Sequence, residues 1–564
     1  MRLKLISLAG LLAASCMTPQ PPPVADAPPM VEAPQPPTMP PRAAASGPQT
    51  FNVMLAPGND PKAGRLVVVA NRIGTVPVAA TEASPRALQP TDASYIAAQE
   101  VPFISPGQAV RFDADALADP YPFSRMEPGE YWVQVRLDTD HDMAYSQGTD
   151  PDSDFTSMPV KIRLPSAAPV DVTLMPERSV LSPNPAPPAP ALFECNGQRI
   201  PKPPTPGDAE AHMRLIDFVS PSLSAFWGRE MHICGIVLLP PGYETTTEKY
   251  PTVYRADGFG SKFTTLINAE RTHFALMKTG ATPPMIRVHL DHSLPGGTHE
   301  FADSLNNGPW GKALTEELIP ALEKQYRMDG KPSGRFTTGH SSGGWYALWQ
   351  QVRYPNVFGG TWARAPDPVD FRSFTGVNIY GHAANAYVRP DGSPQYLVRD
   401  PDGKQTTGLK VYAQRERVFG DYGGQFDSFD WVFSPRGKDG RPQPLFDRVT
   451  GKVDPEVAAY WREHFDITHI IKRDWKTLKP VLDGKIHIII GDTDTFHLDE
   501  AAKLMEQDLK TLGAKAEFTW VPGGTHFNLD RIGDDPQGLE KKIAWEMYAV
   551  ARPNSKLKPP AKKE

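Results

Sequence analysis

The chain has 564 residues, of which 40% are hydrophobic and 22% are charged. This length exceeds one ordinary domain, and the 62 prolines, far above ordinary usage, predict linkers between two or three folded units. A formal net charge of -6 offers no basic field to nucleic acid. No stretch after Pro19 is apolar for long enough to span a bilayer, so membrane contact is expected only through a lipid anchor.

The first residues resemble a bacterial lipoprotein signal. Arg2 and Lys4 form a positive n-region, and residues 5–14 form an apolar h-region too short for a membrane span. Small residues then precede Cys16. The resemblance implies that residues 1–16 are a signal peptide, that Cys16 carries a lipid, and that the protein is exported to the periplasm or cell surface. Ordinary signal-peptide cleavage is the alternative.

Cys195 and Cys234 are the two remaining cysteines. In an oxidising compartment such a pair is a candidate disulfide, and two separate buried thiols are the alternative. We expect no metal there, because a zinc site needs further Cys or His at short spacing. The nearest candidate, His232, merely alternates with Cys234 on a predicted strand.

Composition divides the rest of the chain into five segments. Residues 17–48 are Pro-rich and poor in aromatic residues, which predicts a disordered tether. Residues 49–178 contain short alternating runs between turns, typical of an antiparallel β-sandwich, here an accessory domain. A Pro-rich linker, 179–208, leads to a catalytic domain, 209–553, in which apolar strands alternate with amphipathic helices. Residues 554–564 are a basic flexible tail.

Six aspartates crowd one loop of the predicted sandwich. Carboxylate oxygens at alternate positions can bind Ca²⁺. The EF-hand pattern is not met, because its glycine and distal glutamate are missing, so a solvated acidic loop is favoured over a calcium site. The aspartates are Asp138, Asp140, Asp142, Asp150, Asp152 and Asp154.

Strand and helix alternation from about Ala211 onward predicts a mostly parallel sheet covered by helices on both faces. A long insertion, 367–484, interrupts it. The predicted strands are Ile236–Leu239, Thr252–Tyr254, Met285–Leu290, Phe336–Thr338, Ile486–Ile490 and Phe518–Val521, and the predicted helices are Ala313–Tyr326, Gly343–Val352 and Glu500–Leu512.

The segment Gly339-His340-Ser341-Ser342-Gly343 fits G-x-S-x-G between a predicted strand and a predicted helix. In that context the glycines permit a strained turn that lifts a serine hydroxyl above the sheet, the nucleophile elbow of an α/β-hydrolase. Ser341 is therefore the candidate nucleophile, at a helix N-terminus that favours developing negative charge. An ordinary turn is the alternative.

The base should follow the nucleophile in this fold, and the acid should precede the base. His526 lies in a glycine-bearing loop after the last predicted strand, which favours it over the other C-terminal histidines. The strand before it ends in Gly491-Asp492-Thr493-Asp494. We choose Asp494 as the acid, because it lies further out on the loop, with Asp492 as the runner-up.

An oxyanion hole needs two N–H donors. One is expected from Ser342, the residue after the nucleophile, and the other from the loop after the early strand that ends near Arg255. In that loop, Asp257-Gly258-Phe259-Gly260, the glycines allow the backbone to turn, which makes the Phe259 amide the second donor. A plain β-turn is the alternative.

Together with further motifs, these residues resemble the α/β-hydrolase esterase family that includes enterochelin esterase, S-formylglutathione hydrolase, feruloyl esterases and the mycolyltransferases. The resemblance spans about residues 229–552 and implies a Ser-Asp-His hydrolase, Ser341, Asp494 and His526, without metal or cofactor. Two departures are Asp257, where the family usually has histidine, and Ala365-Pro366, where it usually has Ser-Pro. The motifs that carry it, besides the elbow, are Val237-Leu238-Leu239-Pro240-Pro241-Gly242-Tyr243, Tyr250-Pro251-Thr252-Val253-Tyr254, Glu316-Glu317-Leu318-Ile319-Pro320 and Tyr354-Pro355-Asn356-Val357-Phe358-Gly359.

Two further groups of side chains have open roles. His289, Asp291, His292 and His299 follow a predicted strand, but their irregular spacing favours polar lining of the cleft or plain surface over a metal site. In the insertion, aromatic residues such as Tyr380, Tyr387, Phe426, Phe429, Trp431 and Trp461 suit a sugar or flat acyl group, or they form the insertion's own core.

The sequence therefore predicts a serine carboxylic-ester hydrolase acting on a small-molecule or glycan ester outside the cytoplasm, such as a carbohydrate or siderophore ester. Two alternatives are an acyltransferase to a sugar and a catalytically dead cell-surface binding lipoprotein. The complete Ser, His and Asp set favours an enzyme over a binding protein.

Overall fold

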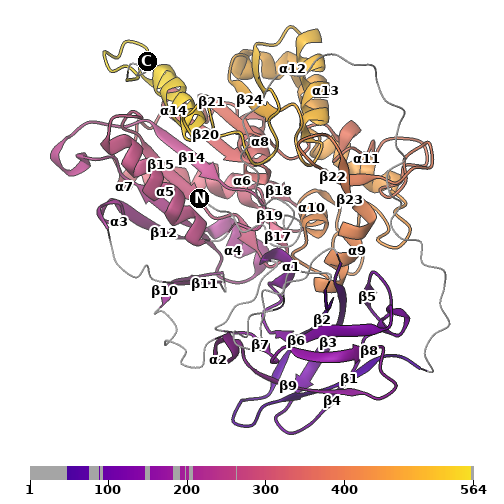
Figure 1. Cartoon of the computed structure of the whole chain (residues 1–564). Coiled ribbons are helices and arrows are strands. Elements are labelled where there is room, and N and C mark those ends of the chain that lie inside the picture. Colours follow the sequence, from indigo (N-terminus) through magenta and orange to yellow (C-terminus); the bar gives the residue numbers. More distant parts are fainter. Residues whose placement is uncertain are drawn as a thin grey trace. The chain divides into compact units, whose positions relative to one another are not determined.

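The structure is a computed structural model (Figure 1), and it describes residues 47–74, 88, 93–146, 153–181, 191–196, 198–201, 207–261 and 263–560. The predicted signal with Cys16 and nearly all of the tether lie outside the described residues, as do Asp150 and Asp152. Within those ranges, no helix combines the length and apolar character needed to cross a membrane.

The chain divides into two compact units. The first consists of residues 1–143, 147–186 and 418–420, and the second of residues 144–146, 187–417 and 421–564. The break near residue 186 falls inside the stretch expected to be a linker. Part of that stretch is folded, however, because β10 (Ala191–Cys195) pairs antiparallel with β11 (Gln198–Pro201).

The first unit is built on one connected sheet of nine strands in the order β4-β1-β9-β7-β6-β2-β3-β5, with β8 paired to β6 (Figure 1). Its pairs are antiparallel except β1 with β9, which departs from the purely antiparallel prediction. More than 100 residues separate these two strands, so no hairpin forces them to run in opposite directions. The strands are β1 (Thr50–Leu55), β2 (Lys62–Arg72), β3 (Tyr95–Ile104), β4 (Val110–Asp113), β5 (Ala118–Asp119), β6 (Gly129–Asp138), β7 (Phe155–Thr156), β8 (Val160–Leu164) and β9 (Val170–Pro176), and the short helix is α2 (Glu177–Leu181). All but the first residue of α1 (Met143–Ser146) belongs to the second unit.

A single apolar core joins both ends of this sheet. Phe51 of β1 packs edge-to-face against Phe112 of β4 and against Phe123, with ring centroids 6.0 and 6.3 Å apart. Leu66 and Val68 of β2 are buried in the same cluster. The sheet therefore encloses its apolar side chains as a sandwich does.

The described part of the acidic loop brings three carboxylates together. Asp138, Asp142 and Asp154 each place one oxygen within 4.8 Å of the others. Burial raises the pKa of Asp138 to about 6, although the Met143 N–H donates to its Oδ2 at 3.1 Å. The solvated acidic loop stays the prediction here, with calcium binding as the alternative.

The second unit contains an eight-stranded sheet in the order β12-β13-β15-β14-β20-β21-β24-β25. β12 and β13 pair antiparallel with their neighbours, and all pairs from β15 to β25 are parallel. This is the α/β-hydrolase fold that the sequence predicted. The strands are β12 (Met213–Val219), β13 (His232–Leu238), β14 (Thr252–Ala256), β15 (Ile286–Leu290), β20 (Arg335–His340), β21 (Gly360–Arg364), β24 (Ile486–Gly491) and β25 (Ala516–Val521).

Helices accompany these strands (Figure 1). The helix predicted from Ala313 to Tyr326 is divided, because Pro320 lacks the N–H that would bond to the preceding turn, and residues 313–318 widen into a π-helix. The helices are α3 (Asp208–Ala211), α4 (Pro221–Trp227), α5 (Phe263–Lys278), α6 (Trp310–Lys312), α7 (Ile319–Gln325), α8 (Ser342–Arg353), α13 (Leu498–Thr511) and α14 (Gly538–Ala551), and two short ladders are β16 (Ser293–Leu294) with β17 (Gly297–Thr298) and β18 (Asp303–Ser304) with β19 (Gly308–Pro309).

The insertion buries most of its aromatic side chains. Phe429 stacks on Phe433 with ring centroids 5.9 Å apart, Phe433 contacts Trp461 at 5.1 Å, and all three are buried. For these residues the structure therefore shows a core. Tyr380 and Trp431 are half-buried. The elements are β22 (Tyr396–Arg399), β23 (Gln405–Gly408), α9 (Leu409–Phe419), α10 (Gln425–Phe433), α11 (Pro455–His464) and α12 (Ile467–Leu482).

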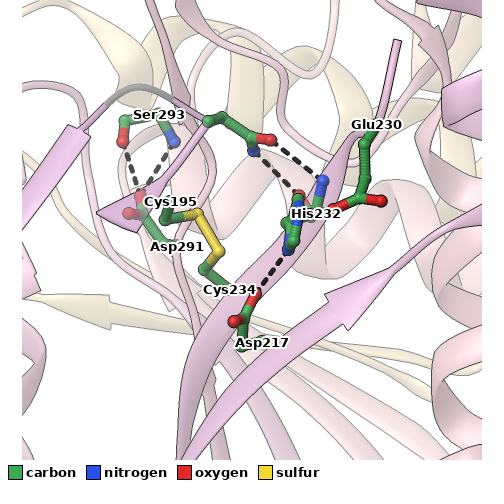
Figure 2. Close-up of a disulfide and its surroundings, with 8 residues drawn as sticks. Cys195, Asp217, Glu230, His232, Cys234, Asp291 and Ser293 are labelled. Atoms are coloured by element: carbon green, nitrogen blue, oxygen red, sulfur yellow. Dashed lines mark hydrogen bonds and ion pairs between the residues drawn. A yellow bond between two sulfur atoms is a disulfide. The ribbon is translucent and has the colours of Figure 1, made fainter. Parts of the chain in front are cut away.

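A disulfide joins Cys195 of β10 to Cys234 of β13 (Figure 2). Next to it, the Asn196 side chain donates to the His232 carbonyl at 2.8 Å and accepts from the His232 N–H at 2.9 Å. His232 itself contacts Asp217 and Glu230, so it has carboxylate partners and is not paired with the cysteines as a metal ligand (Figure 2). The bridge attaches the β10–β11 hairpin to the catalytic sheet.

Candidate active site

Ser341 lies at the sharp turn between β20 and α8. Its backbone has φ 60° and ψ -125°, a conformation that a side-chain-bearing residue rarely adopts. Its N–H donates to the Arg364 carbonyl at 3.0 Å, and its own carbonyl accepts from Gly344 and Trp345 at 2.7 and 3.0 Å. These bonds hold the strained residue from both sides, as a nucleophile elbow requires.

The elbow is possible only with glycine at its flanks. A Cβ atom at Gly339 would lie 2.1 Å from the Gly343 carbonyl oxygen, and one at Gly343 would lie 2.1 Å from the Ala256 carbonyl oxygen. Both distances are far inside van der Waals contact, and the obstructing atoms are backbone. The G-x-S-x-G spacing therefore reflects close packing of β20, α8 and the end of β14.

His526 and Asp494 meet at the carboxyl ends of β24 and β25. His526 Nδ1 donates to Asp494 Oδ2 at 2.9 Å, and both side chains are buried. The other oxygen of Asp494 accepts from the Phe496 N–H at 2.9 Å. Because Nδ1 carries the proton, Nε2 of His526 is the nitrogen that can act as a base.

The alternative acid, Asp492, points elsewhere. It is exposed, and its Oδ1 accepts from the Gly523 N–H at 2.8 Å. Asp492 therefore supports the loop before His526 without contacting the imidazole. Of the two candidates, the structure pairs only Asp494 with His526.

The insertion supports the acid loop. Arg399, at the end of β22, donates from Nε to the Asp494 carbonyl at 2.8 Å and also pairs with the buried Asp499. The Arg399 N–H donates to the Thr495 carbonyl at 3.0 Å. The loop that carries the candidate acid is thus fastened to the insertion by both side-chain and backbone bonds.

A second carboxylate, which the sequence analysis did not single out, contacts the candidate nucleophile. Ser341 Oγ donates to Asp367 Oδ1 at 3.2 Å, and Ser342 Oγ donates to Asp367 Oδ2 at 2.6 Å. Among the described residues, the Ser341 hydroxyl is hydrogen-bonded to Asp367 and not to His526. Hydrogen bonds between catalytic groups often form only when substrate is bound.

Burial of the ionised Asp367 carboxylate is electrostatically unfavourable. Burial raises its pKa to about 6, in spite of the hydrogen bonds from the two serines and the nearby His526. Glu300, also fully buried, has a pKa raised well above its ordinary value by burial and by Asp367. Only its position in the sequence could have indicated that Asp367 lies near the site. It follows β21, and the carboxyl ends of parallel strands meet at one edge of a sheet.

Asp367→Asn is expected to stabilise the protein increasingly as pH rises. The folded state holds the Asp367 proton up to about pH 6, against an ordinary pKa of 3.8, so the wild type loses stability as pH rises through this interval. Asparagine does not titrate. Urea unfolding should show the stability difference between variant and wild type growing by about 2–3 kcal/mol between pH 4 and pH 8. A difference that is the same at both pH values would contradict the burial of a charge here.

The segments that carry the two expected oxyanion donors lie beside Ser341. Ser342 is fully buried and opens α8, where the first N–H groups have no acceptor within the helix. A Cβ atom at Gly258 would lie 3.1 Å from the Ser341 Cβ, so the loop that contains Phe259 passes directly against the nucleophile. A turn bond from the Ser261 N–H to the Gly258 carbonyl, 3.3 Å long, closes this loop.

The four polar residues after β15 do not gather around one point. His289 lies between Asp257 and Glu270, whereas Asp291 accepts from the Ser293 N–H at 3.0 Å. The rings of His292 and His299 are 6.2 Å apart, and burial lowers the pKa of His292 to about 4. Across the described ranges, the residues close enough to share a metal ion are those of the acidic loop in the first unit.

Residues 224–401 match the family model described as "Putative esterase". This segment is therefore similar to that family. It contains Ser341, Ser342 and Phe259, and it ends before Asp494 and His526. The match supports a hydrolase, and the fold agrees with the family that the sequence motifs resembled.

Solved structures of esterases are similar to this chain at low identity. A ferulic acid esterase from Anaeromyces mucronatus is 16% identical with a TM-score of 0.31, covering 59% of this chain and 89% of its own. An S-formylglutathione hydrolase from Agrobacterium tumefaciens is 14% identical with a TM-score of 0.33, covering 60% and 94%. A fluorophosphonate-binding serine hydrolase of Staphylococcus aureus is 13% identical with a TM-score of 0.34, covering 60% and 98%.

Among curated proteins, this chain is similar to the uncharacterized protein YbbA of Bacillus subtilis. The two are 26% identical over 132 residues, which is 22% of this chain. The match spans about half of the YbbA chain, 51%.

Proposed function

We propose that the protein is a serine carboxylic-ester hydrolase whose catalytic triad is Ser341, His526 and Asp494. One observation carries the proposal: a buried Asp494–His526 hydrogen bond of 2.9 Å in the same unit as a serine held at φ 60° on a strand-to-helix turn. A serine in such a strained conformation persists only where surrounding interactions stabilise it, as they do in nucleophile elbows.

In the proposed reaction, Ser341 Oγ attacks the ester carbonyl carbon while His526 Nε2 takes the hydroxyl proton. The C–O bond to the alcohol then breaks, and the proton passes from His526 to the departing alkoxide. Water repeats the sequence on the acyl-enzyme and releases the acid. Asp494 keeps Nδ1 protonated and stabilises the transient imidazolium, and the amides of Phe259 and Ser342 donate to the oxyanion.

The proposed site of action is outside the cytoplasm, on a small-molecule or glycan ester. Two features support export: the lipoprotein-like segment that ends at Cys16, and the Cys195–Cys234 disulfide, since disulfides persist in oxidising compartments. Fractionation of cells that produce the full chain tests this location. Recovery of the protein in the cytoplasm with both thiols reduced would contradict it.

Fluorophosphonate labelling, combined with an ester panel, tests the proposed activity. We expect one label per chain on the peptide that contains Ser341, with hydrolysis lost in proportion to labelling. The panel should include aryl esters, acetylated and feruloylated glycans and siderophore esters, each with and without an added sugar acceptor. Hydrolysis that survives complete labelling, or a label on another residue, would reject the triad assignment.

A further inference from the structure

A buried group of charges lies behind the loop that carries Phe259. Asp257, the first residue of that loop, is almost fully buried, and its Oδ1 accepts from Arg255 Nε at 2.9 Å and from the second guanidinium nitrogen at 2.8 Å. Its other oxygen, Oδ2, is 3.2 Å from His289 Nε2. Strands β14 and β15 thus each supply one cationic side chain to the same carboxylate.

His289 connects this loop to helix α5. Its Nδ1 donates to Glu270 Oε1 at 2.9 Å, and Arg287 Nε donates to the other oxygen of Glu270 at 3.0 Å. His289 and Glu270 are fully buried. The result is a Glu270–His289–Asp257 chain from the middle of α5 to the loop beside Ser341, with a hydrogen bond at Glu270 and an ion-pair contact at Asp257.

The charge state of His289 is set by these two carboxylates. Burial disfavours the imidazolium, but Asp257 and Glu270 outweigh burial and raise the pKa of His289. Burial likewise opposes ionisation of Asp257, yet Arg255 and His289 hold the pKa of Asp257 well below its ordinary range. Removing one member would leave a buried charge without its partner, which is costly.

We propose that His289 is a positioning residue that acts through Asp257 to hold the Phe259 amide where the oxyanion forms. The inference rests on the proposed function. The inference has a simple geometric basis. Asp257 is two residues from Phe259, and the residue between them, Gly258, packs against the Ser341 side chain. A loop fixed at Asp257 has little freedom left at the amide two residues later. Such fixed donors stabilise a transition state because they need no reorganisation during reaction.

This role predicts a dependence of activity on the His289 proton. As pH rises through the raised pKa of His289, the imidazolium becomes neutral, Asp257 loses one of its two cations, and kcat/KM should fall. The charged and titratable groups around this arrangement are first those that face His289 or its two carboxylates: Asp257, Glu270, Asp291, His292, Arg255, Arg287, His273, His340 and Tyr145. Glu540 lies one step further out, paired with Arg255.

His289→Gln tests the proposal, with His273→Gln as its matched control. His273 is a buried histidine of α5 that contacts Arg255 and not Asp257, and burial together with Arg287 lowers its pKa to about 3. Two quantities should be measured on a small aryl ester between pH 6 and pH 10: kcat/KM, and the inhibition constant of a trifluoromethyl ketone, which forms an oxyanion on the serine.

For His289→Gln we expect kcat/KM to fall about 10- to 100-fold, with KM changed less than about 3-fold, because only oxyanion stabilisation is lost. The ketone should bind more weakly by the same factor, since it resembles the transition state. The alkaline decline of the wild type should be absent in this variant and present in His273→Gln.

Two outcomes would overturn the proposal: a His289→Gln variant that melts earlier but keeps ketone affinity and kcat/KM within about twofold, or one that keeps the alkaline decline. If His289→Gln does not fold, Asp257→Asn provides the same comparison with a side chain of equal size. Fluorophosphonate labelling at Ser341 in all variants separates failure of this inference from failure of the proposed triad.

Discussion

Ser341→Ala is expected to lower kcat for an activated aryl ester by ~10⁴-fold or more while the protein stays folded. Every other group of the proposed site acts through the Ser341 hydroxyl, so no remaining residue can take over the attack. The substitution removes one oxygen from a residue held by backbone bonds to Arg364, Gly344 and Trp345, so it should not disturb the elbow. Steady-state kinetics and thermal unfolding measure the two effects.

Ser342→Ala is the matched control. It removes a neighbouring hydroxyl of the same size, which also bonds to Asp367, but it keeps the backbone N–H expected to contact the oxyanion. The fall in kcat should be at least about 100-fold smaller in Ser342→Ala than in Ser341→Ala, because a backbone oxyanion donor remains when the side chain changes. Retention of more than a few per cent of wild-type kcat in Ser341→Ala would show that another nucleophile is at work.

Asp494→Asn is expected to lower kcat by ~10³- to 10⁴-fold, whereas Asp492→Asn should change it less than about threefold. An amide at position 494 can donate to His526, which favours the wrong tautomer of the imidazole. At position 492 the side chain is exposed and accepts only from the Gly523 N–H, a bond that asparagine can keep. Both substitutions make the same chemical change, from a carboxylate to an amide of equal size, so each variant is a control for the other.

Measurement of kcat from pH 5 to pH 9 completes this comparison. Both variants should label at Ser341, but Asp494→Asn should label far more slowly. If Asp492→Asn were the slower enzyme, the acid role would have to move to Asp492.

Much of this site could be predicted from local sequence. Ser341 follows from glycine spacing between a strand and a helix, and His526 from chain order in this fold. Asp494 was preferred to Asp492 by its distance from the end of β24. The chain turns directly after Gly491, so the Asp492 carboxylate accepts from the Gly523 N–H while the Asp494 carboxylate meets the imidazole.

The parts that were missed depend on contacts between distant segments. β21, Gly360–Arg364, was not among the predicted strands, because only Thr361, Trp362 and Ala363 lie between its terminal glycine and arginine, a run too short to mark a buried strand. Without that strand, Asp367 had no place at the edge of the sheet. Edge strand β12 was missed for a similar reason: it is only partly buried, so its pattern is weak. The Glu270–His289–Asp257 chain joins three elements and leaves no spacing signal at all.

The bond from Arg399 to the Asp494 carbonyl has a consequence for how this protein can change during evolution or in the laboratory. Insertions of this fold are where new specificities usually arise, since loops vary while the sheet persists. Here the same segment fastens the acid loop, so exchanging it wholesale for a relative's would also release Asp494. A chimera that changes substrate preference without losing rate should therefore keep the Tyr396–Arg399 strand and replace only the residues on either side of it.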